Sequence, residues 1–367
     1  MTWPMRLAFI AAAGLAAAIV CLLADAHTLL VTYVATMSAV SAIAVGGMSV
    51  LMLTYLVRGD WTEGLHPPLT AAALTIPTAG LLFLPALIGV PWLYPWAHAA
   101  AGEPGSFKAF WLAPFFFIGR TIFYFAVWTL LAFWLRRAWG DPRRMVISAS
   151  AGLIVCALTA SLAGVDWLES LTPEFHSSIY GLLFLTFQLL AGLSFALAIS
   201  LREPGAPVFR YGAILLSALL LWAYNHAMQY IIIWSGDIPE EAIWYVRREA
   251  NGWGVVLWGL IILQFVVPFF AMLMDRVRNA RRPLLIIASS TLALRFAEAY
   301  LLALPGAGIG PIAWLAIPAT IALCGALWLL SFTFAFSIVR SSASDLRPLA
   351  NAFDAPGSPL PAGTPRS

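Results

Sequence analysis

Charged residues and cysteines are both scarce in this chain of 367 residues. Charged residues make up 10% of the sequence and hydrophobic residues 62%, with a mean hydropathy of +0.88, which excludes an ordinary soluble domain of this length. The three cysteines form no CxxC or CxxCH motif, so the sequence offers no site for covalent haem attachment. Of the five histidines, only His226 lies well inside an apolar segment, whereas haem bound between helices needs paired histidines. We therefore expect this chain to hold no metal, haem or other cofactor of its own.

Long apolar segments fill most of the chain. A helix needs roughly 20 apolar residues to cross about 30 Å of hydrocarbon. Ten segments meet this requirement, which predicts an all-α integral membrane protein with one polytopic domain over residues 1–340. The predicted spans are 5–24, 31–57, 69–90, 112–135, 145–164, 178–200, 210–234, 253–274, 283–304 and 312–339.

Two similar basic connections suggest an internal repeat. Residues 136–144 join the fourth and fifth spans, and residues 276–283 join the eighth and ninth. We therefore predict two four-helix bundles, formed by spans 2–5 and 6–9, that repeat in parallel, with spans 1 and 10 peripheral. The tail over residues 341–367 is rich in Pro, Ser and Ala and is predicted to be a disordered cytoplasmic segment.

The distribution of arginine predicts the orientation. Fifteen arginines, from Arg6 to Arg366, fall on one set of ends and loops, while the opposite set carries only Lys108, Arg247 and Arg248. By the positive-inside rule we expect both termini to be cytoplasmic and the spans to contact membrane lipid. This rule explains the arginine clusters, so no nucleic acid is expected as a partner. An alternative for the N-terminus is a signal peptide that ends at Ala24-Asp25-Ala26.

Ionisable side chains inside the spans all fall in the outer half of the predicted bundle. Such groups are expensive in a membrane and usually functional. Because Asp, His, Glu and Tyr can relay protons, we interpret them as a hydrated proton path. Its candidate residues are Arg120, Asp166, Tyr224, His226, Gln229, Arg295 and Glu298. The alternatives are a structural Arg295–Glu298 ion pair, interhelical hydrogen bonding by His226, and an interfacial role for Asp166.

The outer segment 235–252 combines acidic, aromatic and basic residues. Aromatic side chains and Arg often anchor protein interfaces, so this loop is predicted to dock a partner protein. The docking residues would be Pro239, Glu240, Glu241, Trp244, Tyr245 and Arg247. The alternative is a solvated loop whose aromatic residues belong to an interfacial belt.

Three stretches of the sequence resemble a known family of membrane subunits. The first is 166–181, with Asp166, Trp167, Ser170, Leu171, Pro173, Ser177, Ser178, Tyr180 and Gly181. The second is 229–248, with Gln229, Tyr230, Trp234, Pro239, Glu240, Glu241, Trp244 and Tyr245. The third is 253–269, with Trp253, Phe265, Pro268 and Phe269. With the ten-span layout, nearly the whole chain resembles the smaller ten-span subunit of alternative complex III, related to the NrfD or polysulfide-reductase membrane subunits.

The resemblance implies a membrane subunit of a respiratory quinol:cytochrome c (or other electron acceptor) oxidoreductase that scaffolds redox partners, supplies a proton path and is not catalytic alone. It implies a larger homologous ten-span partner that binds the quinol, and periplasmic multihaem cytochrome c and iron–sulfur subunits. The resemblance also implies a bacterial inner membrane, and it allows a quinone or quinol as a small ligand there. Two alternatives remain open: the membrane anchor of a molybdopterin-type reductase, and a stand-alone secondary transporter.

Overall fold

The computed structural model describes residues 2–57, 59, 61–98 and 105–353. Within these residues every regular element is a helix, and ten helical segments are long and apolar enough to cross a membrane. The prediction of an all-α membrane protein with ten spans is thus confirmed at this level. The spans are Trp3–Ala24 (α1), Ala26–Leu56 (α2), Trp61–Ile88 (α3, Trp61–Ala73, and α4, Ile76–Ile88), Pro114–Ala138 (α7), Pro142–Leu171 (α8, Pro142–Trp167, and η2, Glu169–Leu171), Tyr180–Ser200 (α9), Val208–Gly236 (α10), Trp253–Leu273 (α12, Trp253–Leu260; η3, Ile261–Val266; α13, Val267–Leu273), Arg281–Ala303 (α15) and Ala313–Ser341 (α16, Ala313–Thr320; η4, Ile321–Gly325; and the first part of α17, Ala326–Phe353).

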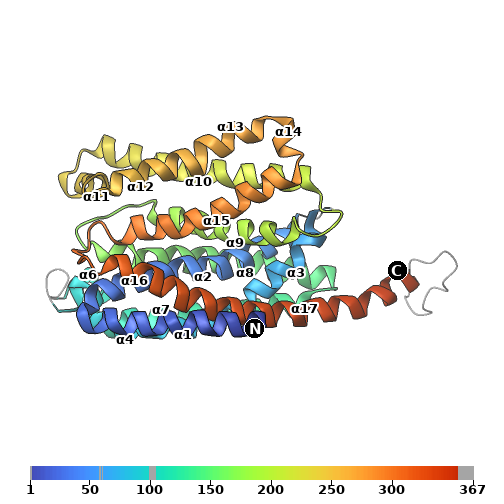
Figure 1. Ribbon diagram of the computed structural model, residues 1–367, viewed down its shortest axis with the longest axis horizontal. Helices are drawn as coiled ribbons and strands as arrows, with labels where there is room; N and C mark the ends of the chain where they lie inside the picture. Colours follow the sequence, from blue (N-terminus) through green and yellow to red (C-terminus); the bar gives the residue numbers. More distant parts are fainter. Residues whose placement is uncertain (1, 58, 60, 99–104, 354–367) are drawn as a thin grey trace.

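The spans lie side by side along the long axis of the molecule and alternate in direction (Figure 1). The connections at 139–141, 201–207 and 274–280, the last with the short helix α14 (Asp275–Arg278), therefore gather at one end, called here the Arg-rich end. The opposite, Arg-poor end carries the short elements α5 (Val90–Leu93), η1 (Pro95–Ala97), α6 (Phe107–Trp111) and α11 (Pro239–Glu249).

Helix α2 occupies the centre of the molecule. Its most apolar stretch is entirely buried, and the helix packs against α3, α8, α9, α15 and α16. Small residues allow the close approach to α9. A methyl group on Gly192 would lie 2.1 Å from the Gly47 backbone nitrogen, and one on Gly46 would overlap the Gln188 backbone. Small residues are typical where membrane helices cross closely, so glycine is required at this crossing.

Several span boundaries differ from the predictions for identifiable reasons. Helix α2 begins at residue 26, not 31, because the Asp25 carboxylate accepts a hydrogen bond from the Thr28 amide at 3.0 Å and caps the helix. The third span begins at residue 61, not 69, and is broken between Ala73 and Ile76 into two helices. In the eighth span the central turn is the π-helix η3, which widens the helix.

The last helix continues beyond the predicted start of a disordered tail. The prediction placed the tail at 341–367, whereas α17 extends to Phe353. A formed helix gains one hydrogen bond for each residue added, without a new nucleation cost, so a sequence of modest helix propensity prolongs it. The remaining tail, 354–367, lies outside the described residues. Helix α17 packs on α1 and α3.

Candidate functional site

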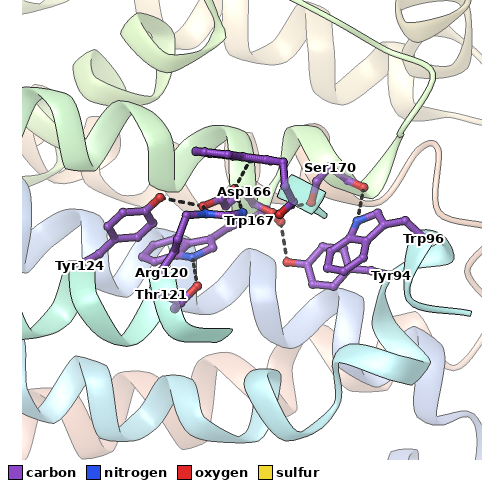
Figure 2. A network of polar contacts seen from close by, with 9 residues as sticks. Tyr94, Trp96, Arg120, Thr121, Tyr124, Asp166, Trp167 and Ser170 are labelled. Carbon is purple, nitrogen blue, oxygen red and sulfur yellow. Dashed lines mark hydrogen bonds and ion pairs between the residues drawn. The ribbon is translucent and has the colours of Figure 1, made fainter. Parts of the chain in front are cut away.

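Two polar clusters lie in the Arg-poor half of the molecule. The first joins α7 to α8 through Arg120 and Asp166. Its guanidinium and carboxylate form two hydrogen bonds, from Nη2 to Oδ1 at 2.7 Å and from Nε to Oδ2 at 3.0 Å (Figure 2). Asp166 is fully buried, and the Tyr124 hydroxyl and the Trp111 indole also donate to it, at 2.8 and 3.2 Å. The carboxylate therefore has four donors.

The guanidinium in this cluster is also well satisfied. Arg120 Nη1 donates to the Trp111 carbonyl at 2.8 Å, and the cation lies 3.9 Å from the centre of the Trp111 ring. Neighbouring aromatic residues fasten the adjacent backbone: Tyr94 donates to the Trp167 carbonyl, and Trp96 donates to the Ser170 carbonyl (Figure 2). With its partners all in place, this ion pair functions as a fixed cross-link between spans.

The second cluster surrounds Glu298 on α15. The Glu298 carboxylate accepts a hydrogen bond from the Trp222 indole at 3.0 Å, lies 2.9 Å from His226 Nε2, and forms an ion pair with Arg295. Trp222 and His226 come from α10, so the carboxylate joins two helices. Both members of the Arg295–Glu298 pair are buried, while His226 retains 30% exposure of its side chain.

Arg295 differs from Arg120 in how its nitrogens are satisfied. Its Nε and Nη2 have no hydrogen-bond partner among the described residues. The cation faces aromatic rings, with ring centres at 5.0 Å for Trp222 and 5.6 Å for Phe187. A buried guanidinium with unpaired nitrogens normally recruits water or a polar ligand. This cluster is therefore the less saturated of the two.

A row of aromatic side chains lies between the two clusters. Trp167 contacts Phe184 with ring centres 6.3 Å apart, and Phe184 stacks on Phe187 at 5.5 Å. Trp167 follows Asp166 in the chain, and Phe187 faces Arg295. The predicted path included residues of both clusters, and the structure separates Asp166 from Glu298 by these rings.

An apolar cavity of about 450 Å³ opens beside the second cluster. Its walls come from α10, α11, α12, η3 and α15, and Glu298 and His226 supply polar groups to it. The aromatic lining residues are Trp222, Tyr230, Trp244, Tyr245, Trp258 and Phe265. Tyr230 and Trp258 are more than half exposed and belong to membrane-spanning helices, so the cavity opens toward the lipid.

The cavity owes part of its shape to η3. Leu260, Ile261 and Phe265 line it, and they come from the π-helical turn or the residue before it. Single π-turns within α-helices are frequent at functional sites because the wider turn changes the direction of the side chains. In the same turn Gln264 points inward and donates to Thr291 at 3.4 Å.

The segment predicted as a docking loop is a helix. Pro239 occupies the first turn of α11, acidic Glu240 and Glu241 follow, and Arg247 and Arg248 occupy the last turn. This order suits the helix dipole, which is the physical reason for a helix here. Glu240 is exposed, and Glu241 is partly exposed.

The aromatic residues of α11 face the protein interior. Trp244 is 5% exposed and stacks on Phe175 with ring centres 4.9 Å apart, so its indole is unavailable to a partner at the surface. Tyr245 lines the cavity and contacts the Gln229 amide, and burial raises the pKa of Tyr245 to about 12. Of the predicted docking residues, Pro239 and Glu240 remain exposed, and Glu241 and Arg247 are partly exposed.

Arg248, the last residue of the second stretch that carries the resemblance, fixes α11 to the bundle. Its guanidinium lies 3.3 Å from the Trp244 ring centre and donates to the carbonyls of Trp244 and Leu302, at 2.9 and 2.6 Å. Burial lowers the pKa of Arg248 to about 9, so the side chain stays protonated at neutral pH. The cavity wall therefore carries a positive charge.

Two further candidates for the proton path have different surroundings. Gln229 is buried beside Tyr245, next to the cavity. Tyr224 is 57% exposed on the outside of α10, away from Glu298. Trp222, which donates to Glu298, was not among the candidates because nothing in an apolar span marks which aromatic side chain will meet a buried carboxylate.

The described residues contain no group of three or more His, Cys, Asp or Glu side chains placed to hold a metal ion. No protein-family model matches the chain, and no curated protein is significantly similar to it. The fold and the site thus define a class of protein. It is a multi-pass α-helical membrane protein with a mainly apolar cavity at its Arg-poor end, and a few polar side chains line that cavity.

Proposed function

We propose that this chain is an integral subunit of a respiratory quinol:acceptor oxidoreductase in a bacterial inner membrane, and that its cavity receives the ring of a quinol. The observation that carries the proposal is the cavity, whose mainly aromatic and aliphatic wall contains Glu298 and His226 side by side, with Arg248 and Glu249 as its other charged residues. Both termini are placed in the cytoplasm and the Arg-poor end outside, on the arginine distribution.

The cavity suits an amphipathic aromatic ligand. Its volume of about 450 Å³ lies within the usual range of roughly 300–1,000 Å³ for small-molecule sites. A quinol ring needs flat apolar walls, an entrance for its isoprenoid tail and polar partners for two hydroxyl groups. Trp258 and Tyr230 border a lipid-facing entrance, and Trp222 forms part of the wall.

Glu298 and His226 are suited to accept protons. Oxidation of one quinol yields one quinone, two protons and two electrons. His226 is partly exposed and lies 2.9 Å from Glu298, so a proton taken from a quinol hydroxyl by the imidazole has a carboxylate next to it. The same carboxylate also forms an ion pair with Arg295. The two electrons would pass to a redox group of a partner subunit.

The partners follow from the same proposal. A larger homologous ten-span subunit would pair with this chain in the membrane, and multihaem cytochrome c and iron–sulfur subunits would cover the Arg-poor end. The exposed first turn of α11, with Pro239 and Glu240, supports docking at this end.

We also propose that spans 2–5 and 6–9 form the two four-helix repeats, which is supported by the packing of α2 with α3 and α8 and of α9 with α10 and α15.

Photolabelling with a short-chain azidoquinone tests the cavity. We expect the label on the cavity segments of α10 and α12, in competition with unlabelled quinone, and we expect Trp258→Ala to reduce it several-fold. Trp314→Ala is the matched control, because Trp314 is an 85% exposed tryptophan at the same end on α16, outside this cavity. Labelling confined to other helices would contradict a quinol site here.

Gentle purification tests the assignment to a complex. We expect haem-containing and iron–sulfur subunits to co-purify with the chain. A homogeneous single polypeptide with transport activity would instead support a secondary transporter, whose site normally lies near the midplane of the membrane. A co-purifying molybdopterin enzyme would identify the chain as a reductase anchor.

A further inference from the structure

Three buried polar atoms near the cavity lack a hydrogen-bond partner among the described residues. They are Glu169 Oε2, Tyr180 Oη and Arg248 Nε. Their residues are 7%, 0% and 1% exposed. Because an unpaired buried polar atom is unfavourable, ordered water normally fills such a site when several polar atoms converge there.

Tyr180 links these groups. Its side chain interacts electrostatically with Arg248, Glu169 and Glu298. Its ring packs against Phe175 with centres 6.2 Å apart, and Phe175 stacks on the cavity residue Trp244. Since carbonyl oxygens hold both Nη atoms of Arg248, its Nε is the nitrogen left for another acceptor.

Glu169 lies directly below the surface of the Arg-poor end. Its Oε1 accepts a hydrogen bond from the Ser177 amide at 2.8 Å, within the loop at 172–179. Glu174, His176 and Ser178 of this loop are exposed. A proton that reaches Glu169 is therefore separated from bulk water by one short loop.

We infer that Tyr180, Glu169 and Arg248 hold a cluster of internal water that conducts protons from Glu298 to the Arg-poor face. The inference rests on the proposed function for the source of the protons. The proton leaves Glu298 or His226 for water and reaches the Tyr180 hydroxyl, which donates its own proton as it accepts another. The proton then passes to Glu169 and to the bulk, and each donor is left ready for the next transfer.

This route replaces Asp166 as the outward step. The four donors to Asp166 leave it no free position for water, and the rings of Trp167, Phe184 and Phe187 separate it from Glu298. Glu169, three residues further along the chain, keeps one oxygen unpaired.

Radiolytic footprinting of the intact complex tests for the water without relying on activity. Hydroxyl radicals formed from internal water oxidise side chains that touch it, even where bulk solvent has no access. We expect Tyr180 to be oxidised several-fold faster than the matched control Tyr124, which is 2% exposed but has its hydroxyl bonded to Asp166. Equal, slow oxidation of both tyrosines would overturn the inference.

The rate of quinol oxidation in two variants tests whether protons follow this route. Tyr180→Phe and Glu169→Gln should each slow quinol oxidation several-fold and raise its solvent isotope effect, with quinone affinity unchanged. Tyr124→Phe, the same chemical change in the other cluster, should leave both unaltered. Wild-type turnover in both Tyr180→Phe and Glu169→Gln would overturn the exit route. Absence of quinone binding in the unmodified complex would instead refute the proposed function, while the footprinting result would still decide whether the water is present.

Discussion

Removing one partner of the Arg120–Asp166 pair should destabilise the protein much more than removing both. Arg120→Met leaves the Asp166 carboxylate fully buried with only the Tyr124 and Trp111 donors. Breaking a buried ion pair in this way typically costs about 3–5 kcal/mol. A change of 1 kcal/mol shifts Tm by roughly 2–4 °C in a domain of 150–250 residues, so in this longer chain we expect a fall on the order of 5–10 °C.

The buried cysteines provide the assay. Cys21, Cys156 and Cys324 are all buried, so a fluorogenic maleimide reacts with them only as the protein unfolds in detergent. Because such unfolding is often irreversible, all variants are compared at one heating rate. Arg137→Met is the matched control, since Arg137 is an exposed arginine of the same helix, and its Tm should equal that of the wild type.

The double variant Arg120→Met/Asp166→Leu separates loss of the pair from loss of packing. Replacing both charges by apolar groups of similar volume is often neutral for stability, so this variant should recover most of the lost Tm. It should also retain azidoquinone labelling of the cavity, because the aromatic row separates the pair from Glu298. A single variant as stable as the wild type, or a double variant as unstable as the single, would refute the reasoning.

Three shorter predictions concern other parts of the fold. Gly192→Ala should cost at least about 1–3 kcal/mol, because the new methyl group would lie 2.1 Å from the Gly47 nitrogen, and the same maleimide assay measures this loss. Asp25→Ala should cost about 0.5–2 kcal/mol through loss of the α2 cap. Hydrogen bonds from Thr28 hold the pKa of Asp25 below its usual value, so the difference in Tm between wild type and Asp25→Ala should be full above about pH 4 and disappear as the pH falls further. Trp244→Ala should release α11, since the Phe175 stack and the Arg248 contact are lost, and limited proteolysis at residues 237–252 would reveal it; unchanged protection would contradict this role.

The ten spans could be predicted because a long apolar segment has few other stable structures in a membrane. The ends of the spans differ from the predictions where a single side chain fixes the start of a helix, as the Asp25 cap does for α2. The helix α11 also has a sequence signal, with Pro239 at the start, acidic residues in the first turn and basic residues in the last, which identifies a helix more directly than a loop.

The pairing of the candidate residues could not be predicted to the same extent. Asp166 and Glu298 were placed at similar depth, but depth does not tell which face of a helix meets which neighbour. Trp167, next to Asp166 in the sequence, is buried and donates to Thr121, a contact that depth in the membrane does not predict. The π-turn η3 within 253–274 was not predicted, although Pro268, which cannot donate a backbone hydrogen bond, lies two residues after it.

The two ion pairs differ in how completely hydrogen bonds satisfy their charged atoms, and we use this difference to separate a structural group from a candidate reactive one. Around Asp166 each charge meets a fixed donor or acceptor, so a change of protonation would leave several partners unpaired at once, and the cost opposes proton transfer. Around Glu298 the cation keeps unpaired nitrogens, the neighbouring His226 is partly exposed, and a cavity adjoins the carboxylate. The Glu298 carboxylate itself has Trp222, His226 and Arg295 as partners, but the cavity beside it leaves room for water or a ligand next to His226. For this reason we propose Glu298 and His226 for the chemistry and a stabilising role for the Arg120–Asp166 pair.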